Sequence, residues 1–322
     1  MSEPSVSQIT ISAEEEGQRL DNFLLKWAKG VPKSHIYRII RSGEIRVNKK
    51  RATVTTRIAQ GDIIRIPPIR VAYREDVSHD VEIGYSAKKV SENLPILFED
   101  ASLLIVNKPS GLAVHGGSGV SLGLIEALRI ARPELKYLEL VHRLDRDTSG
   151  ILMLAKKRSA LTTMHEEIRT GRMDKRYVLV AHGQFEGGHG HVPLEYPLHK
   201  YLLPNGERRV KVDRNGQESL TIIKHLGSSH QQQSFVAEAI LKTGRTHQIR
   251  VHLQHIGHPI LGDDKYGVAE LDKKIGVKRL MLHAFRLVFT HPLTKEKMQI
   301  QAPLPAGFSI ETLGGSTEIK ER

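Results

Sequence analysis

Charged residues gather in the segment VHRLDRDTSG, residues 141–150, which leads directly into a strand-like run over 151–155. Charged side chains packed against a strand cost free energy unless they are paired. The segment is therefore either a well-satisfied turn or a functional site. Its carboxylates are Asp145 and Asp147, which would share a face of an extended stretch because they are two residues apart.

Two further segments combine basic and aromatic or polar residues. MDKRY, residues 173–177, enters a predicted strand at 178–181. GRTHQIRVHL, residues 244–253, passes through a glycine turn into a predicted helix that ends at Gly257. Backbone N–H groups at such a turn and helix start suit an anion.

Other chemistries are disfavoured by composition. The chain has no cysteine, which excludes disulfides, Cys-ligated zinc, iron–sulfur clusters and a thiolate nucleophile. Histidines recur at 247, 252, 255 and 258, but they lack an HExxH pattern or a carboxylate at ligand spacing, so we expect no metal. The run 116–119, GGSG, lacks the endings of a phosphate or dinucleotide loop, and we expect a mobile loop near a cleft.

The elements that must position these segments form an α+β pattern from residue 94 onwards. Strands are predicted at 96–98 and 103–106 as a hairpin, then a helix at 121–130. A closing hairpin with its turn at Pro292 ends the pattern. The sequence thus predicts a catalytic or binding domain over 94–311, followed by a polar tail, 312–322.

The positive charge is concentrated near the N-terminus. The 322 residues carry a net charge of +12 and a pI near 9.7. Between residues 17 and 67, twelve basic residues face three acidic ones, so this segment supplies +9 of the total. Before it we predict a polar tail, 1–16, and after the Pro67-Pro68 pair an acidic linker, 69–93.

The order of elements in 17–68 predicts two short amphipathic helices followed by a basic hairpin. With GVPKSHIYRIIRSGEIRVNKKR at its centre, the segment resembles the small RNA-binding domain of the ribosomal-protein-S4 type, the alpha-L motif. The resemblance implies that a basic face contacts RNA phosphates and supplies affinity more than sequence information. The residues expected on that face are Lys33, Arg38, Arg41, Lys49, Lys50 and Arg51.

The second domain resembles the RluA family of pseudouridine synthases. HRLDRDTSG, KRY and GRTHQIRVHL match the three signature motifs of that family, in order. Three further runs occur in the family order, namely NKPSG, PILGDDKYG and LMLHAFRLVFTHP. The resemblance implies a mixed, largely antiparallel sheet with flanking helices and a central cleft.

The family reaction turns a uridine of an RNA chain into pseudouridine, and it implies no cofactor and no metal. Because the chain has no cysteine, a carboxylate must do the covalent work. The family motif implies that this carboxylate is Asp145. Whether it attacks the sugar, adds to the ring or removes the 2′ hydrogen stays open. Asp147 is expected to have a structural role in the turn.

The resemblance also assigns the other site residues. Arg245 resembles the family arginine that pairs with the catalytic aspartate, and a phosphate contact is its alternative role. Tyr177 resembles the tyrosine that packs on the target base, and it is a candidate for moving the proton of carbon 5. Arg143 is expected to fill the gap left by a flipped nucleotide. Lys175 and Arg250 are expected to contact RNA phosphates or to be surface ion-pair partners.

Within the family, residues 111–161 are most similar to synthases of the bacterial large ribosomal subunit, which implies 23S ribosomal RNA, free or precursor, as the partner. Alternative targets are the sites of a D-type paralogue or tRNA, and a non-catalytic RNA-binding assembly factor is the rival class. An RNA methyltransferase would need a glycine-rich cofactor loop, which the sequence lacks. No apolar targeting or membrane segment is evident, so we expect a cytoplasmic protein, acting as a monomer without a nucleotide cofactor.

Overall fold

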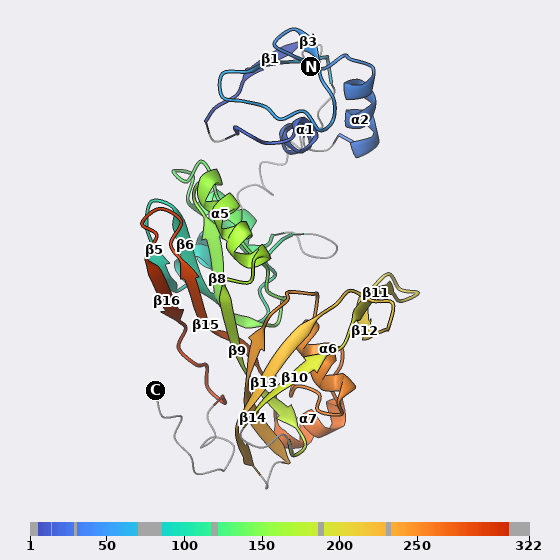
Figure 1. Cartoon of the computed structure of the whole chain (residues 1–322), viewed down its shortest axis with the longest axis vertical. Coiled ribbons are helices and arrows are strands. Elements are labelled where there is room, and N and C mark those ends of the chain that lie inside the picture. Colours follow the sequence, from blue (N-terminus) through green and yellow to red (C-terminus); the bar gives the residue numbers. More distant parts are fainter. Residues whose placement is uncertain are drawn as a thin grey trace. The chain divides into compact units, whose positions relative to one another are not determined.

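The computed structural model describes residues 6–13, 15–28, 31–69, 86–116, 122–185, 190–229 and 233–308. The chain divides into two compact units, Met1–Glu82 and Ile83–Arg322 (Figure 1). The predicted 69–93 linker lies mostly outside the described residues, and its described part contains a helix at 86–92. The expected loop at 116–119 lies outside them except for its first residue, and so does the 312–322 tail.

The N-terminal unit places two helices, α1 (Leu20–Trp27) and α2 (Lys33–Arg41), beside a four-stranded sheet of order β1-β4-β2-β3. The helices bury Leu20, Leu24, Ile36 and other apolar residues that recur at helical spacing, so each apolar stripe becomes a core face. The sheet strands are β1 (Ser7–Thr10), β2 (Arg46–Val47), β3 (Lys50–Arg51) and β4 (Ile63–Ile66).

The predicted N-terminal tail, 1–16, is wrong for residues 7–10. They form β1, which pairs antiparallel with β4 and sets Ile9 opposite Ile64. Ile11, just after the strand, is 1% exposed. The alternating isoleucines thus extend the core of the unit, which a polar tail could not do.

The second unit is built on a ten-stranded sheet whose main path is β10-β13-β14-β9-β15-β8-β6-β5, with β16 beside β15 and β7 beside β8. All described strand pairs are antiparallel except β8 with β15. This confirms the expected α+β class with a mixed, largely antiparallel sheet. The strands are β5 (Ile96–Glu99), β6 (Leu103–Lys108), β7 (Glu139–Leu140), β8 (Ser149–Ala155), β9 (Asp174–His182), β10 (His191–Glu195), β13 (Leu220–Ser229), β14 (Ser234–Leu241), β15 (Leu282–Thr290) and β16 (Lys297–Gln301).

Helices and one separate ribbon complete the second unit. The ribbon, β11 (Leu198–Leu202) with β12 (Arg208–Val212), packs Leu198 and Val210 against Val251 of a helix. The helices are α4 (Leu124–Ala131), α5 (Arg158–Arg169), α6 (Gln248–His255) and α7 (Ala269–Ile275). None of the described helices is long and apolar enough to span a membrane.

The centre of the sheet carries the elements of the charged segments. Every residue of β8 is buried, and the segment 141–148 leads into it. Gly150 has φ of 107°, and a Cβ there would lie 2.2 Å from the carbonyl oxygen of Ala284 on β15. Only glycine therefore permits the close approach of β8 and β15.

Candidate active site

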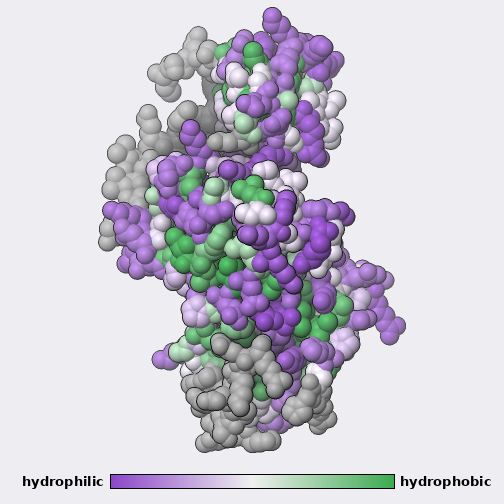
Figure 2. Space-filling view, turned by 60° about the vertical axis from the view of Figure 1, so that its left-hand side comes forward, coloured by the Kyte–Doolittle hydropathy of each residue, from purple (hydrophilic) through white to green (hydrophobic). Residues whose placement is uncertain are grey.

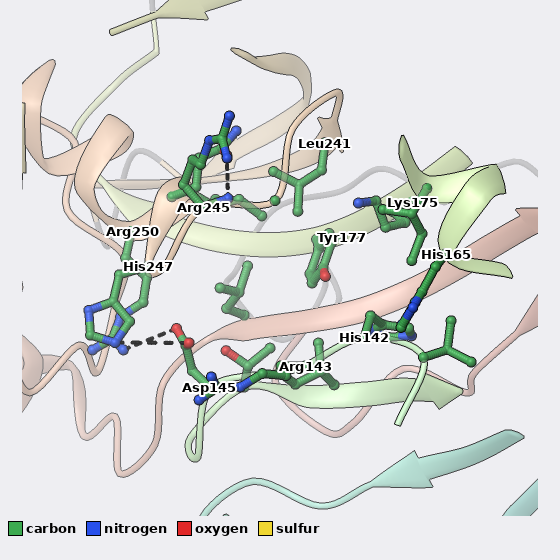
Figure 3. Close-up of a pocket in the computed structure, with 18 of the residues that line it drawn as sticks. His142, Arg143, Asp145, His165, Lys175, Tyr177, Leu241, Arg245, His247 and Arg250 are labelled. Carbon is green, nitrogen blue, oxygen red and sulfur yellow. Dashed lines mark hydrogen bonds and ion pairs between the residues drawn. The ribbon is translucent and has the colours of Figure 1, made fainter. Parts of the chain in front are cut away.

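A pocket of about 480 Å³ opens where the segment before β8, the strand β9 and the start of α6 meet. All three charged segments line it, although they lie up to about a hundred residues apart in the chain. Figure 3 shows Tyr177 lying between two groups, with Asp145, His247 and Arg250 on one side and Lys175, His142 and His165 on the other.

Asp145 presents a carboxylate to this pocket, and its side chain is 27% exposed. Its Oδ2 lies 3.4 Å from Nη1 of Arg250, and its Oδ1 lies 3.9 Å from Nε2 of His247. Both partners come from the start of α6, where they stand three residues apart and so share a face of the helix.

Arg250 is buried, with 2% of its side chain exposed. Its Nε donates to Oδ2 of Asp263 at 2.8 Å and its Nη2 to Oδ1 at 2.6 Å, and Nη2 also donates to Asp264 at 3.0 Å. Burial lowers the pKa of Arg250, but its hydrogen bonds to Asp263 and the charges of the nearby carboxylates outweigh that effect and raise the pKa overall. The guanidinium is thus a fixed cation beside Asp145.

This geometry corrects two expectations. Arg250 does not face solvent to contact RNA phosphates, because its side chain is buried and bonded to Asp263. Arg245 does not pair with Asp145, and its Nε instead donates to the carbonyl oxygen of Glu218 at 3.1 Å. The reason is that α6 begins only at Gln248, so Arg245 precedes the helix while Arg250 lies on its inner face. Arg245 still lines the pocket.

His247 is a site residue that the sequence offered only as one of four candidate metal ligands. Its Nδ1 lies 2.8 Å from the hydroxyl of Tyr266, and burial lowers its pKa. The other three histidines have separate partners, since His252 bonds Ser219, His255 packs on Tyr196 and His258 bonds a backbone carbonyl. No group of potential metal ligands occurs among the described residues.

Tyr177 is 7% exposed and comes from β9. Burial, together with the charge of Asp145, raises the pKa of its hydroxyl far above the ordinary value. The side chain is thus a neutral phenol whose ring forms part of the pocket wall. It is suited to contact a planar ring and is a poor tyrosinate base.

The remaining pocket residues differ in exposure. Arg143 is exposed and lines the pocket. Lys175 is partly buried and lines the pocket, and burial lowers the pKa of its ammonium group. His142 accepts a hydrogen bond from the backbone N–H of Met153 at 3.2 Å, and burial with the charge of Lys175 lowers its pKa to about 4.

Asp147 lies in the turn and pairs with Arg146 at 3.1 Å, while its backbone carbonyl accepts from Ser110 at 2.6 Å. Lys108 ties the same turn to the neighbouring loop, because its Nζ donates to the carbonyls of Pro109, Leu112 and Arg146. Burial lowers the pKa of Lys108 to about 7, while three carbonyl acceptors match the three N–H groups of the charged form. The turn before β8 is therefore both well satisfied and part of the pocket.

The basic residues of the N-terminal unit also differ in their contacts. Arg51 donates to the carbonyl of Arg41 at 2.8 Å and Arg38 pairs with Glu44 at 3.3 Å, so both side chains are partly committed within the unit. Lys33, Arg41, Lys49 and Lys50 are exposed. Asn48 and Lys49 adopt positive φ, as a two-residue hairpin turn requires, and present the lysines at the tip. In the view of Figure 2, hydrophilic residues predominate on this unit.

Comparisons with family models support both units. Residues 102–255 match the model described as RNA pseudouridylate synthase, and residues 18–64 match the S4 domain.

Curated proteins resemble the chain over nearly its whole length. It is 52% identical over 305 residues to a "Ribosomal large subunit pseudouridine synthase C" of Yersinia pestis, covering 94% of this chain and 93% of that protein. The protein of the same name from Escherichia coli (strain K12) is 49% identical over 314 residues, covering 94% and 95%.

Two solved structures also resemble the chain. Human RNA Pseudouridylate Synthase Domain Containing 4 matches at 29% identity with a TM-score of 0.56, covering 73% of this chain and 97% of that chain. Human RNA Pseudouridylate Synthase Domain Containing 1 matches at 28% identity with a TM-score of 0.55, covering 66% and 84%.

Proposed function

The chain belongs to the RNA pseudouridylate synthase family, and from that premise we propose that it isomerises uridines of 23S ribosomal RNA with Asp145 as the catalytic carboxylate. The target is inferred from the names of the relatives that match 94% of the chain. The observation that carries the proposal is the carboxylate of Asp145 beside the buried Arg250, in a pocket that also contains Tyr177.

The reaction breaks the bond between C1′ of the ribose and N1 of uracil and forms a bond between C1′ and C5. The proton of C5 is lost and N1 gains one, so the product is an isomer and no electrons are exchanged. The protein must supply an anionic group near the sugar, and a surface that keeps the detached base in place while it turns. Asp145 can act as nucleophile or base in the first role, and Tyr177 supplies the surface.

The surrounding cations fit the handling of a nucleotide taken out of an RNA helix. Arg250 fixes the carboxylate, because it is itself anchored by Asp263. Arg143 is exposed and can occupy the space that a flipped nucleotide leaves. Lys175 lies inside the pocket, so its partner is the flipped nucleotide and not the flanking backbone.

The N-terminal S4 domain is proposed to hold the RNA through phosphate contacts of its exposed cations, Lys33, Arg41, Lys49 and Lys50. Such contacts add affinity with little sequence preference, so the choice of uridine depends on the second unit. We further propose that the protein acts as a monomer in the cytoplasm, where ribosomal RNA is modified.

The test is release of tritium from an RNA transcript labelled at C5 of its uridines, because isomerisation transfers that label to water. The wild-type protein is expected to release tritium, and Asp145→Asn to release none above background. Asp264→Asn is a matched control, because its side chain is 52% exposed and contacts Arg250 without lining the pocket. Tritium release by Asp145→Asn at the wild-type rate would contradict the assignment. RNA binding without release by the wild type would indicate a non-catalytic factor.

A further inference from the structure

Two side chains from the start of α6 face Asp145, and one of them, Arg250, is a permanent cation that forms an ion pair with it. The other neighbour, His247, occupies the N-cap position of α6 with φ of 52° and directs its Nε2 at Oδ1 of Asp145, 3.9 Å away (Figure 3). The two oxygens of the carboxylate therefore face two different donors from one helix.

The hydrogen-bond partners of Tyr266 favour one tautomer of His247. The backbone N–H of Val210 donates to the Tyr266 hydroxyl oxygen at 3.0 Å, and Nδ1 of His247 lies 2.8 Å from the same oxygen. If the hydroxyl donates to Nδ1, both the hydroxyl proton and the lone pair of Nδ1 have a partner. The proton of the imidazole then sits on Nε2 and points at Asp145.

The opposite tautomer is unfavourable at both ends. It would leave the hydroxyl proton of Tyr266 without an acceptor among the described residues, and it would turn the lone pair of Nε2 toward a carboxylate. Burial also disfavours the charged imidazolium, with Asp145 and Asp263 opposing that effect and Arg250 and Lys265 adding to it. The neutral Nε2–H form is the one that pairs Nδ1 with the Tyr266 hydroxyl and turns a donor toward Asp145.

We propose that His247, oriented by Tyr266, is a positioning residue that holds Oδ1 of Asp145 while Arg250 holds Oδ2. A closure of under about 1 Å brings Nε2 and Oδ1 into hydrogen-bond range, as often happens when substrate fills a site. The two donors would then fix the rotation of the carboxylate, which a single ion pair leaves free. The inference rests on the proposed function, because it concerns the same carboxylate.

Variants at position 247 separate the role of the Nε2–H donor from the requirement for a residue that tolerates positive φ. His247→Asn keeps a residue that tolerates positive φ and can still reach Tyr266, but it loses the donor at the Nε2 position. His247→Gln places an amide nitrogen close to that position. Tyr266→Phe removes the hydroxyl that selects the tautomer. His255→Asn is the matched control, because His255 is an exposed histidine of the same helix that packs on Tyr196 and does not line the pocket.

The measurement is kcat and KM for tritium release from a 23S rRNA transcript, with melting temperatures of all variants. We expect His247→Asn to lower kcat by about 10–100-fold with KM unchanged, His247→Gln to restore most of it, and Tyr266→Phe to lower kcat by about 3–10-fold. A wild-type kcat in a folded His247→Asn would overturn the inference. So would equal loss in His247→Gln and His247→Asn.

Asp145→Asn, measured alongside, distinguishes the two levels of the proposal. If that variant releases tritium at the wild-type rate, the assignment of Asp145 fails, and if the wild-type protein releases none, the proposed function itself fails. If it is inactive while the 247 and 266 variants behave as wild type, only the positioning role is wrong. Should His247→Asn fail to fold, Tyr266→Phe still decides the outcome, because a kcat of wild-type size in that variant would overturn the positioning role.

Discussion

The guanidinium of Arg250 donates two short hydrogen bonds to the carboxylate of Asp263, 2.8 Å from Nε and 2.6 Å from Nη2. Asp263 also accepts from the backbone N–H groups of Lys265 and Tyr266. Arg250 is thus held rigidly by a carboxylate outside the pocket, and its third nitrogen, Nη1, is the one that faces Asp145.

Asp263→Asn is expected to destabilise the protein by about 3–5 kcal/mol, because it leaves the buried guanidinium without its main counter-ion. Tritium release should fall as well, since Arg250 would lose its fixed position. Urea denaturation measures the first effect. Asp264→Asn removes a carboxylate that is 52% exposed and contacts the same arginine, so it should change stability by under about 1 kcal/mol. Equal effects of the two substitutions would show that Asp263 is not the anchor.

The two arginines of GRTHQIR are expected to differ in kinetics. Arg250→Lys should lower kcat by at least about 100-fold, because an ammonium cannot bond Asp263 through two nitrogens and still reach Asp145. Arg245→Lys should affect mainly KM, since Arg245 lines the pocket without touching Asp145. Steady-state rates with the labelled transcript separate these outcomes, and the reverse pattern would restore Arg245 as the partner of the carboxylate.

His283 predicts how stability depends on pH. The residue is 0% exposed, and burial with the charge of Arg279 lowers its pKa from 6.5 to about 4. Between those pH values His283 is protonated in the unfolded chain and neutral in the folded protein, so stability falls as pH drops from about 6.5 toward 4. His283→Asn should reduce that slope by about one proton, or ~1.4 kcal/mol per pH unit. Equal slopes from urea titrations of both proteins would refute the assignment.

Gly150 is expected to tolerate no side chain. Gly150→Ala would meet the Ala284 carbonyl at 2.2 Å in addition to an unfavourable φ, so the expected cost is at least about 3 kcal/mol. Gly206→Ala is the comparison, because Gly206 also has positive φ but no atom lies within 4 Å of the added carbon. That variant should lose only about 1 kcal/mol in thermal denaturation. Similar losses would mean that backbone strain alone matters.

The salt dependence of RNA binding tests the N-terminal unit. Replacing Lys33, Lys49 and Lys50 together by Gln should weaken binding and reduce the slope of log affinity against log salt by about 2–3. The control replaces three exposed lysines of the second unit, Lys273, Lys274 and Lys297, by Gln. Filter binding at several salt concentrations reports both slopes. An unchanged slope in the first variant would show that its lysines only solvate the surface.

The sequence could predict the catalytic region because motifs mark it, but it could not predict which side chains meet. Asp145 and Tyr177 were expected in one site, and both line the pocket. Arg245 and Arg250 are five residues apart in one motif, and the choice between them depends on where α6 begins and on Asp263, thirteen residues further along. His247 acquires its direction from Tyr266, a contact that helical or strand periodicity does not contain.

Local patterns predicted elements with clear apolar stripes or alternation, such as α1, α2 and the hairpin of β5 and β6, but they gave no prediction for α5, α7 or the strands β10 to β13. They missed β1, because four residues with a single alternating isoleucine carry little signal. The strand exists only through its partner β4, more than fifty residues away. Pairings of that kind depend on the folded chain as a whole.

The position of β15 in the sheet determines when the sheet can be completed during translation. β15 lies between β8, which follows Asp145, and β9, which carries Tyr177, yet it is made from residues 282–290 near the end of the chain. Before Leu282 has emerged from the ribosome, the nascent chain already contains β8 and β9 but lacks the strand that lies between them. The sheet is therefore complete only after residues 282–290 have been translated, and this delays the first possible encounter between a finished site and its RNA.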